Sequence, residues 1–309
     1  MLINGPEWLC GSFTPLVTPF REGHVDYCAF EQLVDQQVEG GSHGVVITGT
    51  TGEPTSLTTH ERLELFRRAV AVVARRCPVV AATGTLRQDE TIALTAAAAE
   101  AGVTAVMVVA PGFIKPSAEG LGRYFEAVLG AVEIPALLYN IPGRAGVTIT
   151  AEVVARVASA CPNLVGIKTA SPDLEYVTDL LVAHGPQFRI FCGLESYTWP
   201  MMAIGAAGVM SAVGNLMPRV VADMCEAVFA GDMAMARSIH LKLHRLNQSI
   251  FFDTNPGPLK TMMAMMRLSS AELRPPLAEP SAAVVARLDA VLRDFGALPS
   301  LSCAGQASS

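Results

Sequence analysis

The sequence predicts an α/β fold, a (β/α)8 TIM barrel followed by a C-terminal helical extension. Short apolar β-type runs alternate strictly with segments of helical periodicity, and this alternation gives a parallel sheet. Eight such units follow one another with short connections, and eight is the number of strands that closes a parallel sheet into a barrel. The open, doubly wound alternative is disfavoured because no G-x-G-x-x-G fingerprint follows an early strand.

The first two units show how each element is recognised. A strand over 12–20 has prolines at its edges, and helix 26–39 carries apolar residues at helical spacing before it stops at two glycines. Helix 59–76 begins at a capping box formed by Thr58 and Glu61. The other strands are expected at 44–48, 78–83, 105–110, 135–139, 164–168, 189–192 and 208–213, and the other helices at 89–101, 117–132, 150–160, 174–183 and 196–205.

Three regions divide the chain. Residues 1–216 are expected to form the barrel with the catalytic centre. Residues 217–298 exceed what the eighth unit needs and are expected to form the last barrel helix and the extension. Residues 299–309 are small and polar, which predicts a flexible tail. The helices of the second region are expected at 220–230, 232–251, 259–267 and 282–295.

The bulk composition excludes several classes of protein. Hydrophobic residues make up 51% of the 309 residues and charged residues only 16%, so a large core is available and global disorder is excluded. The net charge of -6 argues against a nucleic-acid-binding surface. No apolar run reaches about 18 residues and no basic stretch precedes an apolar one at the N-terminus, so we expect a cytoplasmic protein without membrane contact.

Lys168 is the first candidate catalytic residue. It ends a short apolar strand between Pro162 and Pro172, and the ends of barrel strands are where catalytic residues of this fold lie. We expect it to be half buried, and burial disfavours the ammonium form of a lysine. A neutral amine can attack the carbonyl of a keto acid and form a Schiff base. The alternative is a lysine that simply extends into solvent.

Tyr139 ends the preceding strand, 29 positions before Lys168, which is the length of one β-α-β unit. The phenol is therefore expected beside the amine, where it could pass a proton to or from an intermediate. Its alternative role is that of a rim aromatic with its hydroxyl in water. Arg144, in the following turn, offers a bidentate grip on a carboxylate, although most loop arginines are merely solvated.

The end of the second strand carries the segment Thr48-Gly49-Thr50-Thr51-Gly52. Its glycines let the backbone approach a ligand closely, and its hydroxyl and N–H groups predict a cradle for a carboxylate. It is not a nucleotide-binding P-loop, because no lysine follows the second glycine. A plain glycine turn is the alternative.

Four segments together resemble the dihydrodipicolinate synthase / N-acetylneuraminate lyase family of Schiff-base barrels: 49–53, 139–144, 166–168 and 255–260. The resemblance implies no cofactor, no metal, and a homotetramer built as a dimer of dimers. It also implies two substrates, pyruvate or a related 2-keto acid and an aldehyde. The roles that it implies are catalytic for Lys168 (the imine with pyruvate), Tyr139 (acid and base) and Thr50 (proton relay), and substrate-binding for Gly49, Thr51, Arg144, Gly193 and Met210.

The chain departs from the family pattern at two places that bear on the reaction. Phe113 stands where the synthases have a second tyrosine, supplied to a neighbouring subunit, and a phenyl ring cannot carry a proton. Thr169 stands where a glutamate commonly follows the lysine. We expect a dihydrodipicolinate synthase-like aldol condensation or cleavage, that is, a lyase of the class I aldolase type. These departures keep open a 2-keto-3-deoxy sugar acid aldolase or dehydratase.

Two further alternatives belong to other classes. A catalytically silent keto-acid-binding barrel would keep Arg144 and the threonine turn without needing a reactive amine. A metal-dependent aldolase would need ligands at strand ends, but the close pair His240 and His244 lies in the C-terminal extension and lacks an evident third ligand.

Overall fold

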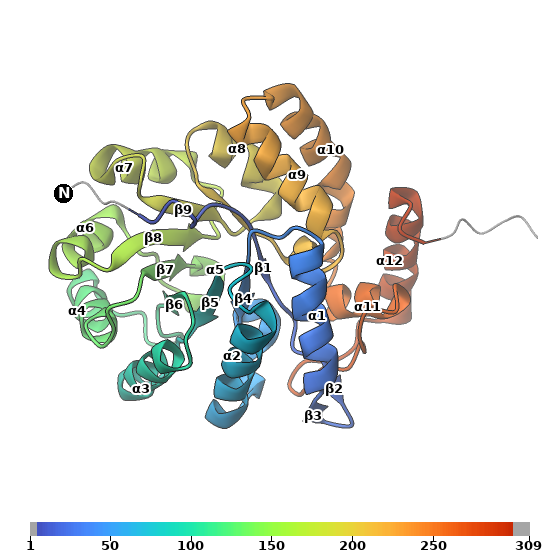
Figure 1. The fold of residues 1–309 in the computed structure, drawn as a ribbon, viewed down its shortest axis with the longest axis horizontal. Helices are drawn as coiled ribbons and strands as arrows, with labels where there is room; N and C mark the ends of the chain where they lie inside the picture. Colours follow the sequence, from blue (N-terminus) through green and yellow to red (C-terminus); the bar gives the residue numbers. More distant parts are fainter. Residues whose placement is uncertain (1–4, 299–309) are drawn as a thin grey trace, which may run out of the picture.

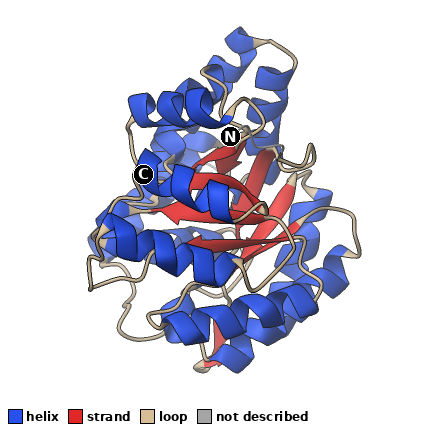
Figure 2. Cartoon of the chain, turned by 90° about the vertical axis from the view of Figure 1, so that its left-hand side faces the viewer, coloured by secondary structure: helices blue, strands red, loops and turns tan. Residues whose placement is uncertain are grey.

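Eight parallel strands close into a barrel, and the helices that connect them form the outer layer (Figure 1). The computed structural model describes residues 5–298. Around the barrel the strands follow in the order β1, β10, β9, β8, β7, β6, β5, β4, so each strand pairs with its neighbour along the chain and the last pairs with the first. The predicted (β/α)8 barrel is confirmed, and Figure 2 shows the strands at the centre with helices around them.

Each barrel strand overlaps the range expected for it. The strands are β1 (Gly11–Pro15), β4 (Gly44–Ile47), β5 (Val79–Ala82), β6 (Ala105–Val109), β7 (Ala136–Asn140), β8 (Leu164–Thr169), β9 (Arg189–Cys192) and β10 (Gly208–Met210). The helices that follow them in turn are α1 (Tyr27–Glu39), α2 (Thr59–Val73), α3 (Gln88–Glu100), α4 (Ala118–Leu129), α6 (Ala151–Ala160), α7 (Leu174–His184), α8 (Thr198–Ala203) and α9 (Pro218–Phe229).

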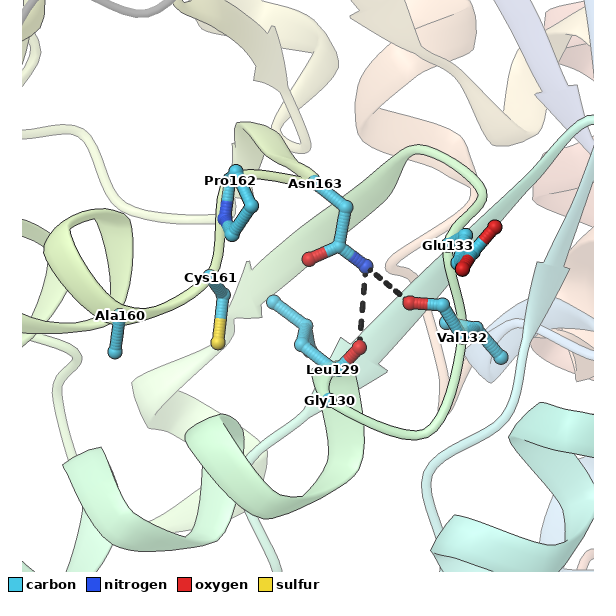
Figure 3. A pocket seen from close by; sticks show the side chains of 8 residues that line it. All are labelled: Leu129, Gly130, Val132, Glu133, Ala160, Cys161, Pro162 and Asn163. Atoms are coloured by element: carbon cyan, nitrogen blue, oxygen red, sulfur yellow. Dashed lines mark hydrogen bonds between the residues drawn. The ribbon is translucent and has the colours of Figure 1, made fainter.

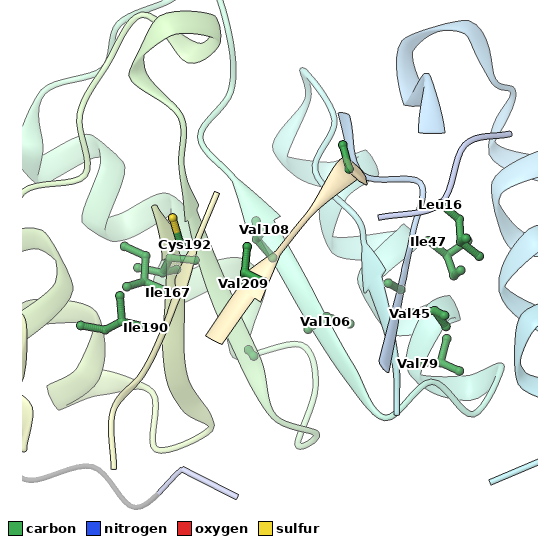
Figure 4. Close-up of a cluster of buried hydrophobic side chains, with 14 of the residues drawn as sticks. Leu16, Val45, Ile47, Val79, Val106, Val108, Ile167, Ile190, Cys192 and Val209 are labelled. Carbon is green, nitrogen blue, oxygen red and sulfur yellow. The ribbon is translucent and has the colours of Figure 1, made fainter. Parts of the chain in front are cut away.

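Side chains alternate between two buried layers along the strands. In β4, Val46 points into the barrel, whereas Val45 and Ile47 point outward toward the helices. The inner layer also holds Phe13 and Phe191, whose rings meet edge to face with centroids 5.2 Å apart. Figure 4 shows part of the outer layer, which fills the space between the sheet and the helices. Both faces of every strand are covered, which is why the strands are near-continuous aliphatic runs.

Side-chain caps define where the helices begin. The predicted capping box at the start of α2 is confirmed: the Thr58 hydroxyl accepts a hydrogen bond from the Glu61 N–H, and the Glu61 carboxylate accepts one from the Thr58 N–H at 2.8 Å. Asp26 caps α1 and Ser117 caps α4 in the same way, each by accepting a hydrogen bond from an N–H of the first turn. These residues set the helix starts within one position of the prediction.

Some predicted bounds were wrong. The first strand ends at Pro15, and a small hairpin of β2 (Phe20–Arg21) and β3 (His24–Val25) follows, too short to produce a recognisable alternation. A four-residue helix, α5 (Pro142–Ala145), lies directly after β7. The last strand ends at Met210, because the chain then turns into a 3-10 helix over Ala212–Asn215.

Three more helices make up the C-terminal extension: α10 (Met233–Ser249), α11 (Gly257–Met265) and α12 (Ala282–Phe295). Helix α9 packs against β1, α10 packs against α9 and α12, and α11 packs against α12. The residues of the predicted flexible tail, 299–309, lie outside the described part of the chain. Within residues 5–298, none of the helices is both long and apolar enough to cross a membrane.

Candidate active site

Lys168 and Tyr139 lie side by side at the carboxyl ends of neighbouring strands. They are register partners in the pairing of β7 with β8, and the Lys168 Nζ atom is 4.4 Å from the centroid of the Tyr139 ring. Their predicted placement on one end of adjacent strands is therefore confirmed. A tyrosine ring that lies against a lysine amine can exchange protons with an intermediate bound to that amine.

Lys168 is buried, with 5% of the residue exposed, so the expectation of a half-buried side chain was wrong. The barrel interior encloses it because the strand ends on both sides pack against it. Gly193, directly after β9, is part of this packing: a Cβ atom added there would lie 2.9 Å from the Lys168 Cε atom and 3.1 Å from the Thr169 carbonyl oxygen. Glycine is the residue that leaves room for the lysine side chain.

The threonine turn after β4 forms one wall of the site. Thr48 adopts a left-handed conformation with φ 53°, and its hydroxyl donates to the Ala82 carbonyl oxygen at 2.8 Å. A 3-10 helix then runs over Thr50–Gly52, and Thr51 within it is buried. This left-handed residue and the following short helix turn the backbone of Gly49 and Thr50 toward the centre of the barrel end.

A cavity of about 40 Å³ lies between this turn and Tyr139. Gly49, Thr50 and Tyr139 all line it, so the structure brings these three predicted residues together. Arg62 of α2 lines it as well and was not predicted. Its guanidinium donates to the carbonyl oxygens of Ala82 and Gly84, and burial lowers the pKa of Arg62 to about 10. No sequence signal distinguishes Arg62 from the other arginines of α2, because its burial depends on how α2 packs against β5.

Arg144 reaches the same region from helix α5. Its Nη2 atom donates a hydrogen bond to the main-chain oxygen of Asn255, 3.2 Å away. The Asn255 side chain in turn donates through Nδ2 to the Thr51 hydroxyl, also at 3.2 Å. Asn255 belongs to a segment that the sequence analysis singled out, but no role at the site was predicted for it. It joins two predicted substrate-binding residues that are far apart in the sequence.

A fully buried ion pair stands directly behind the threonine turn. Glu53 follows the turn, adopts a left-handed conformation with φ 55°, and pairs with Lys260 of α11. Both side chains are 0% exposed. Lys260 also donates to the Glu272 carbonyl oxygen at 2.8 Å, and its Nζ atom lies 4.1 Å from the centroid of the Phe20 ring. Burial lowers the pKa of Lys260, while the neighbouring Glu53 charge opposes that shift.

Two more residues complete the surroundings of the lysine. Met210 ends β10, is buried, and belongs to the same interior cluster as Tyr139. Glu195, which was not predicted, is buried beyond β9 and accepts a hydrogen bond from the Ala212 N–H at 2.7 Å. Burial raises the pKa of Glu195, and the Lys168 charge is among the influences that lower it.

Phe113 is not packed into this site within the chain. It is 91% exposed and adopts a left-handed conformation with φ 70° in the loop after β6. Its neighbour Ile114 is 67% exposed, and Leu86 in the loop before α3 is 61% exposed. These three side chains place apolar surface at the rim of the barrel.

A larger pocket of about 430 Å³ lies at the opposite end of the barrel (Figure 3). It is formed where α4 and α6 end and the strands β7 and β8 begin. Its Asn163 amide already donates to the carbonyl oxygens of Leu129 and Val132, at 3.1 and 2.9 Å. In barrels of this kind the amino ends of the strands serve stability and the carboxyl ends serve chemistry, so this pocket does not compete with the lysine site.

Comparison with known proteins agrees with this geometry. Residues 9–294 match the Dihydrodipicolinate synthetase family. The chain is similar to 4-hydroxy-tetrahydrodipicolinate synthase of Thermus thermophilus, with 48% identity over 94% of this chain and 97% of that protein. It is also similar to the enzyme of the same name from Trichlorobacter lovleyi, with 41% identity over 92% of this chain and 98% of that protein.

Solved structures show the same fold. The crystal structure of dihydrodipicolinate synthase from Aquifex aeolicus superimposes with a TM-score of 0.91 and 38% identity, covering 93% of this chain and 98% of that one. The Acinetobacter baumannii dihydrodipicolinate synthase complexed with pyruvate superimposes with a TM-score of 0.91 and 33% identity, over 94% of this chain and 100% of that one. On the match of nearly its whole length in sequence and structure, the chain belongs to the Dihydrodipicolinate synthetase family.

Proposed function

We propose that this protein is a 4-hydroxy-tetrahydrodipicolinate synthase, which condenses pyruvate with aspartate semialdehyde. As a member of its family the chain is a Schiff-base lyase of the class I aldolase type. The observation that carries the proposal is the buried Lys168 amine, 4.4 Å from the Tyr139 ring, in a chain 48% identical to a synthase of that name.

The first half of the proposed reaction forms an imine. The Lys168 amine attacks the keto carbon of pyruvate through its nitrogen lone pair and gives a carbinolamine. Tyr139 then donates a proton to the departing hydroxyl, which leaves as water, and the nitrogen lone pair forms the C=N bond of a protonated imine. Thr50, in the wall of the same cavity, relays protons to and from Tyr139.

The second half forms a carbon–carbon bond. The protonated imine draws electrons from the neighbouring methyl group, which gives a proton to the Tyr139 phenolate and becomes an enamine. The enamine carbon attacks the aldehyde carbon, and the aldehyde oxygen takes up a proton from Tyr139 to become a hydroxyl. Water then adds to the resulting imine and releases the product from Lys168. Besides the groups of the site and the two substrates, these steps need only water, which is also released when the first imine forms.

Substrate binding is proposed to divide between two walls. The backbone of Gly49 and Thr51 holds the pyruvate carboxylate through N–H groups, and Gly193 and Met210 shape the pocket around the methyl group. Arg144 holds the carboxylate of the second substrate, because a guanidinium binds a carboxylate through two parallel hydrogen bonds. We further propose a cytoplasmic homotetramer, assembled as a dimer of dimers, in which the exposed rim around Phe113 is covered.

The test is covalent trapping. The protein is incubated with pyruvate and borohydride, and the modified peptide is identified by mass spectrometry. A reduced pyruvyl group on Lys168, absent from Lys168→Arg and retained in the surface control Lys242→Arg, is the expected result. A folded wild-type protein without the adduct would refute the Schiff-base mechanism and support a keto-acid-binding barrel without catalysis.

The second candidate function is a 2-keto-3-deoxy sugar acid aldolase or dehydratase. It is favoured by Phe113, whose ring is 91% exposed and has no proton to transfer, and by Thr169, which has no carboxylate. Steady-state rates with aspartate semialdehyde and with a panel of 2-keto-3-deoxy acids separate the two functions. A semialdehyde rate no faster than background, with a sugar acid turned over, would replace the first proposal by the second.

A further inference from the structure

Strand β8 changes face before it reaches Lys168. The side chains of a regular strand alternate, so residues two positions apart share a face. Val165 belongs to the inner layer of the barrel, yet Ile167 belongs to the outer layer. Regular alternation from Val165 would have turned Lys168 outward, toward the helices. Instead its amine lies inside, 4.4 Å from the centroid of the Tyr139 ring.

A β-bulge explains this change of face. The register between β7 and β8 shifts by one residue, because Ala136 pairs with Leu164 whereas Leu137 pairs with Gly166. One extra residue is therefore inserted into β8, which is the definition of a bulge. Gly166 is suited to this place, since a Cβ atom there would overlap the Arg189 carbonyl oxygen. The bulge is what directs the lysine into the barrel.

A bulged pairing has a competing register. If β8 slipped by one residue against β7, every later side chain of β8 would change face and Lys168 would point outward. Two residue pairs lie at the far end of this pairing, Tyr139 with Lys168 and Asn140 with Thr169. The contacts of these pairs therefore decide whether the amine stays inside.

The last pair is joined through its side chains. The Asn140 Nδ2 atom donates a hydrogen bond to the Thr169 hydroxyl oxygen at 3.2 Å. Asn140 is 1% exposed and Thr169 is 0% exposed, and both follow inward-facing residues, so their side chains lie on the outer face of the sheet. The amide is held in one orientation, because its Oδ1 atom accepts a hydrogen bond from the Ile149 N–H at 3.0 Å.

This side-chain bond can form in one register only. Main-chain groups do not distinguish the registers, since each of these residues carries the same donor and acceptor. A slip of one residue would place Lys168 or Ala170 opposite Asn140, and neither side chain can accept a hydrogen bond. The buried amide of Asn140 would then lose its partner, which is unfavourable.

We propose that Asn140 and Thr169 are positioning residues: their side-chain hydrogen bond holds the end of β8 in the register that the bulge sets, and so keeps the Lys168 amine against Tyr139. Both act from the outer face of the sheet, without touching the substrate. This inference rests on the proposed function and adds to it the contact that fixes the placement of the reactive amine.

The experiment measures the rate of imine formation. The protein is mixed with pyruvate, borohydride is added after increasing intervals, and the adduct on Lys168 is quantified at several pyruvate concentrations. Thr169→Val keeps the shape of the side chain but removes its hydroxyl. It is expected to lower the limiting rate roughly 10- to 100-fold, because a shift of about 1 Å disrupts attack geometry. The pyruvate concentration that gives half the limiting rate is expected to change less than about twofold, since the turn proposed to bind the carboxylate is unaltered.

Three further variants separate the hydroxyl from its packing. Thr169→Ser keeps the acceptor and is expected to recover most of the limiting rate. Thr169→Ala lacks the hydroxyl and supplies the same comparison if the valine variant does not fold. Thr95→Val removes a fully buried hydroxyl of α3, 2.7 Å from the Thr83 hydroxyl, and is expected to keep the wild-type rate. Urea denaturation measures the free energy of unfolding of each variant.

Three results would overturn the inference. A wild-type limiting rate in a folded variant without the Thr169 hydroxyl would show that the register does not depend on it. Equal slowing in the Ser and Val variants would assign the effect to packing, and equal slowing in Thr95→Val would assign it to lost stability. Absence of the adduct in the wild type refutes the proposed function, whereas an adduct that forms equally fast in all variants refutes this inference alone.

Discussion

At the scale of single residues, the site depends on how closely its neighbours surround Lys168. The lysine is buried by strand ends, a tyrosine ring and a glycine, so its reactivity is a property of packing as much as of its own chemistry. Buried polar and ionisable groups gather at this end of the barrel, among them Glu195, Arg62 and Lys260. Groups of this kind concentrate at functional sites, where burial shifts their proton affinities.

Gly193 is the residue whose substitution tests this packing. A methyl group there would lie 2.9 Å from the Lys168 Cε atom, so Gly193→Ala must displace the lysine side chain or the strand end. We expect kcat to fall by roughly 100-fold or more, because a shift of about 1 Å disrupts attack geometry, while the protein stays folded. Gly120→Ala in α4 is the control, since its added methyl group meets only ordinary contacts at 3.5 Å. Equal activity of the two variants would contradict this account.

Inhibition by the amino acid lysine is a second property that depends on single residues. By the family resemblance, the positions that bind lysine in regulated synthases are occupied here by Thr59, Leu86 and Gly112. Leu86 is apolar and 61% exposed, and Gly112 has no side chain, so neither supplies a polar contact. We expect no inhibition by millimolar lysine in a steady-state assay at saturating and at limiting pyruvate. A dose-dependent loss of activity would show that a different set of residues binds lysine.

At the scale of elements, the fold is held by contacts where one element begins and another ends. Helix α2 starts with a capping box, and the carboxylate of that box also receives a bidentate ion pair from Arg274 in the extension. The turn after β4 is fastened to α11 by Glu53 and Lys260. Both connections hold the extension against the carboxyl ends of the strands, where the site lies.

The Glu53–Lys260 pair is expected to behave as buried pairs do. Lys260→Met leaves the Glu53 carboxylate buried without its cation, and we expect the free energy of unfolding to fall by about 3–5 kcal/mol. The double variant Glu53→Leu/Lys260→Met leaves no unpaired charge and is expected to recover part of that loss. Arg245→Met, which breaks an exposed pair with Asp294, is the control and costs less than about 1 kcal/mol. Urea denaturation of the wild type and all three variants measures these changes in the free energy of unfolding.

Glu61 gives a prediction for pH. The hydrogen bonds from Arg274 hold the pKa of Glu61 at about 2, below its ordinary value of 4.5. A carboxyl with a depressed folded-state pKa stabilises the fold above its unfolded pKa, and this stabilisation is lost as the pH falls through the folded value. Glu61→Gln should therefore lower the free energy of unfolding by about 2 kcal/mol at pH 7. The difference from wild type should shrink steadily below pH 4.5, and a difference independent of pH would argue against the ion pair.

At the scale of the whole molecule, the extension is part of both the core and the site. Val221 and Cys225 of α9 and Leu246 of α10 are fully or almost fully buried, and α9 packs against β1. Asn255 and Lys260 then bring the extension back to the open end of the barrel. The predicted division at residue 216 therefore separates segments that share one core.

A chain shortened to residues 1–216 tests this shared core. It lacks the helix that covers β1, and the exposed apolar surface should prevent cooperative folding. We expect native-like far-ultraviolet circular dichroism without a sharp thermal transition, or aggregation, whereas a chain of residues 1–298 unfolds cooperatively like the full protein. A shortened chain that melts sharply and traps pyruvate on Lys168 would show that the barrel is an independent unit.

The features that could be predicted from the sequence are those that depend on residues close together in the chain. The alternation of apolar runs and helical segments predicts the barrel, because each strand and helix is recognised from its own few residues. The separation of 29 residues between Tyr139 and Lys168 predicts their contact, since one β-α-β unit brings consecutive strand ends together. The caps at Asp26, Thr58 and Ser117 are local for the same reason.

What the sequence determined by itself was thus the barrel, its helices, and the residues placed at the ends of its strands. Tertiary structure alone decided that Lys168 is buried, that Asn255 joins Thr51 to Arg144, and that Glu53 pairs with Lys260. Thr51 and Asn255 are 204 positions apart. No periodicity or turn preference acts over such a distance, so contacts of this kind are set only when the barrel closes and the extension folds back over its open end.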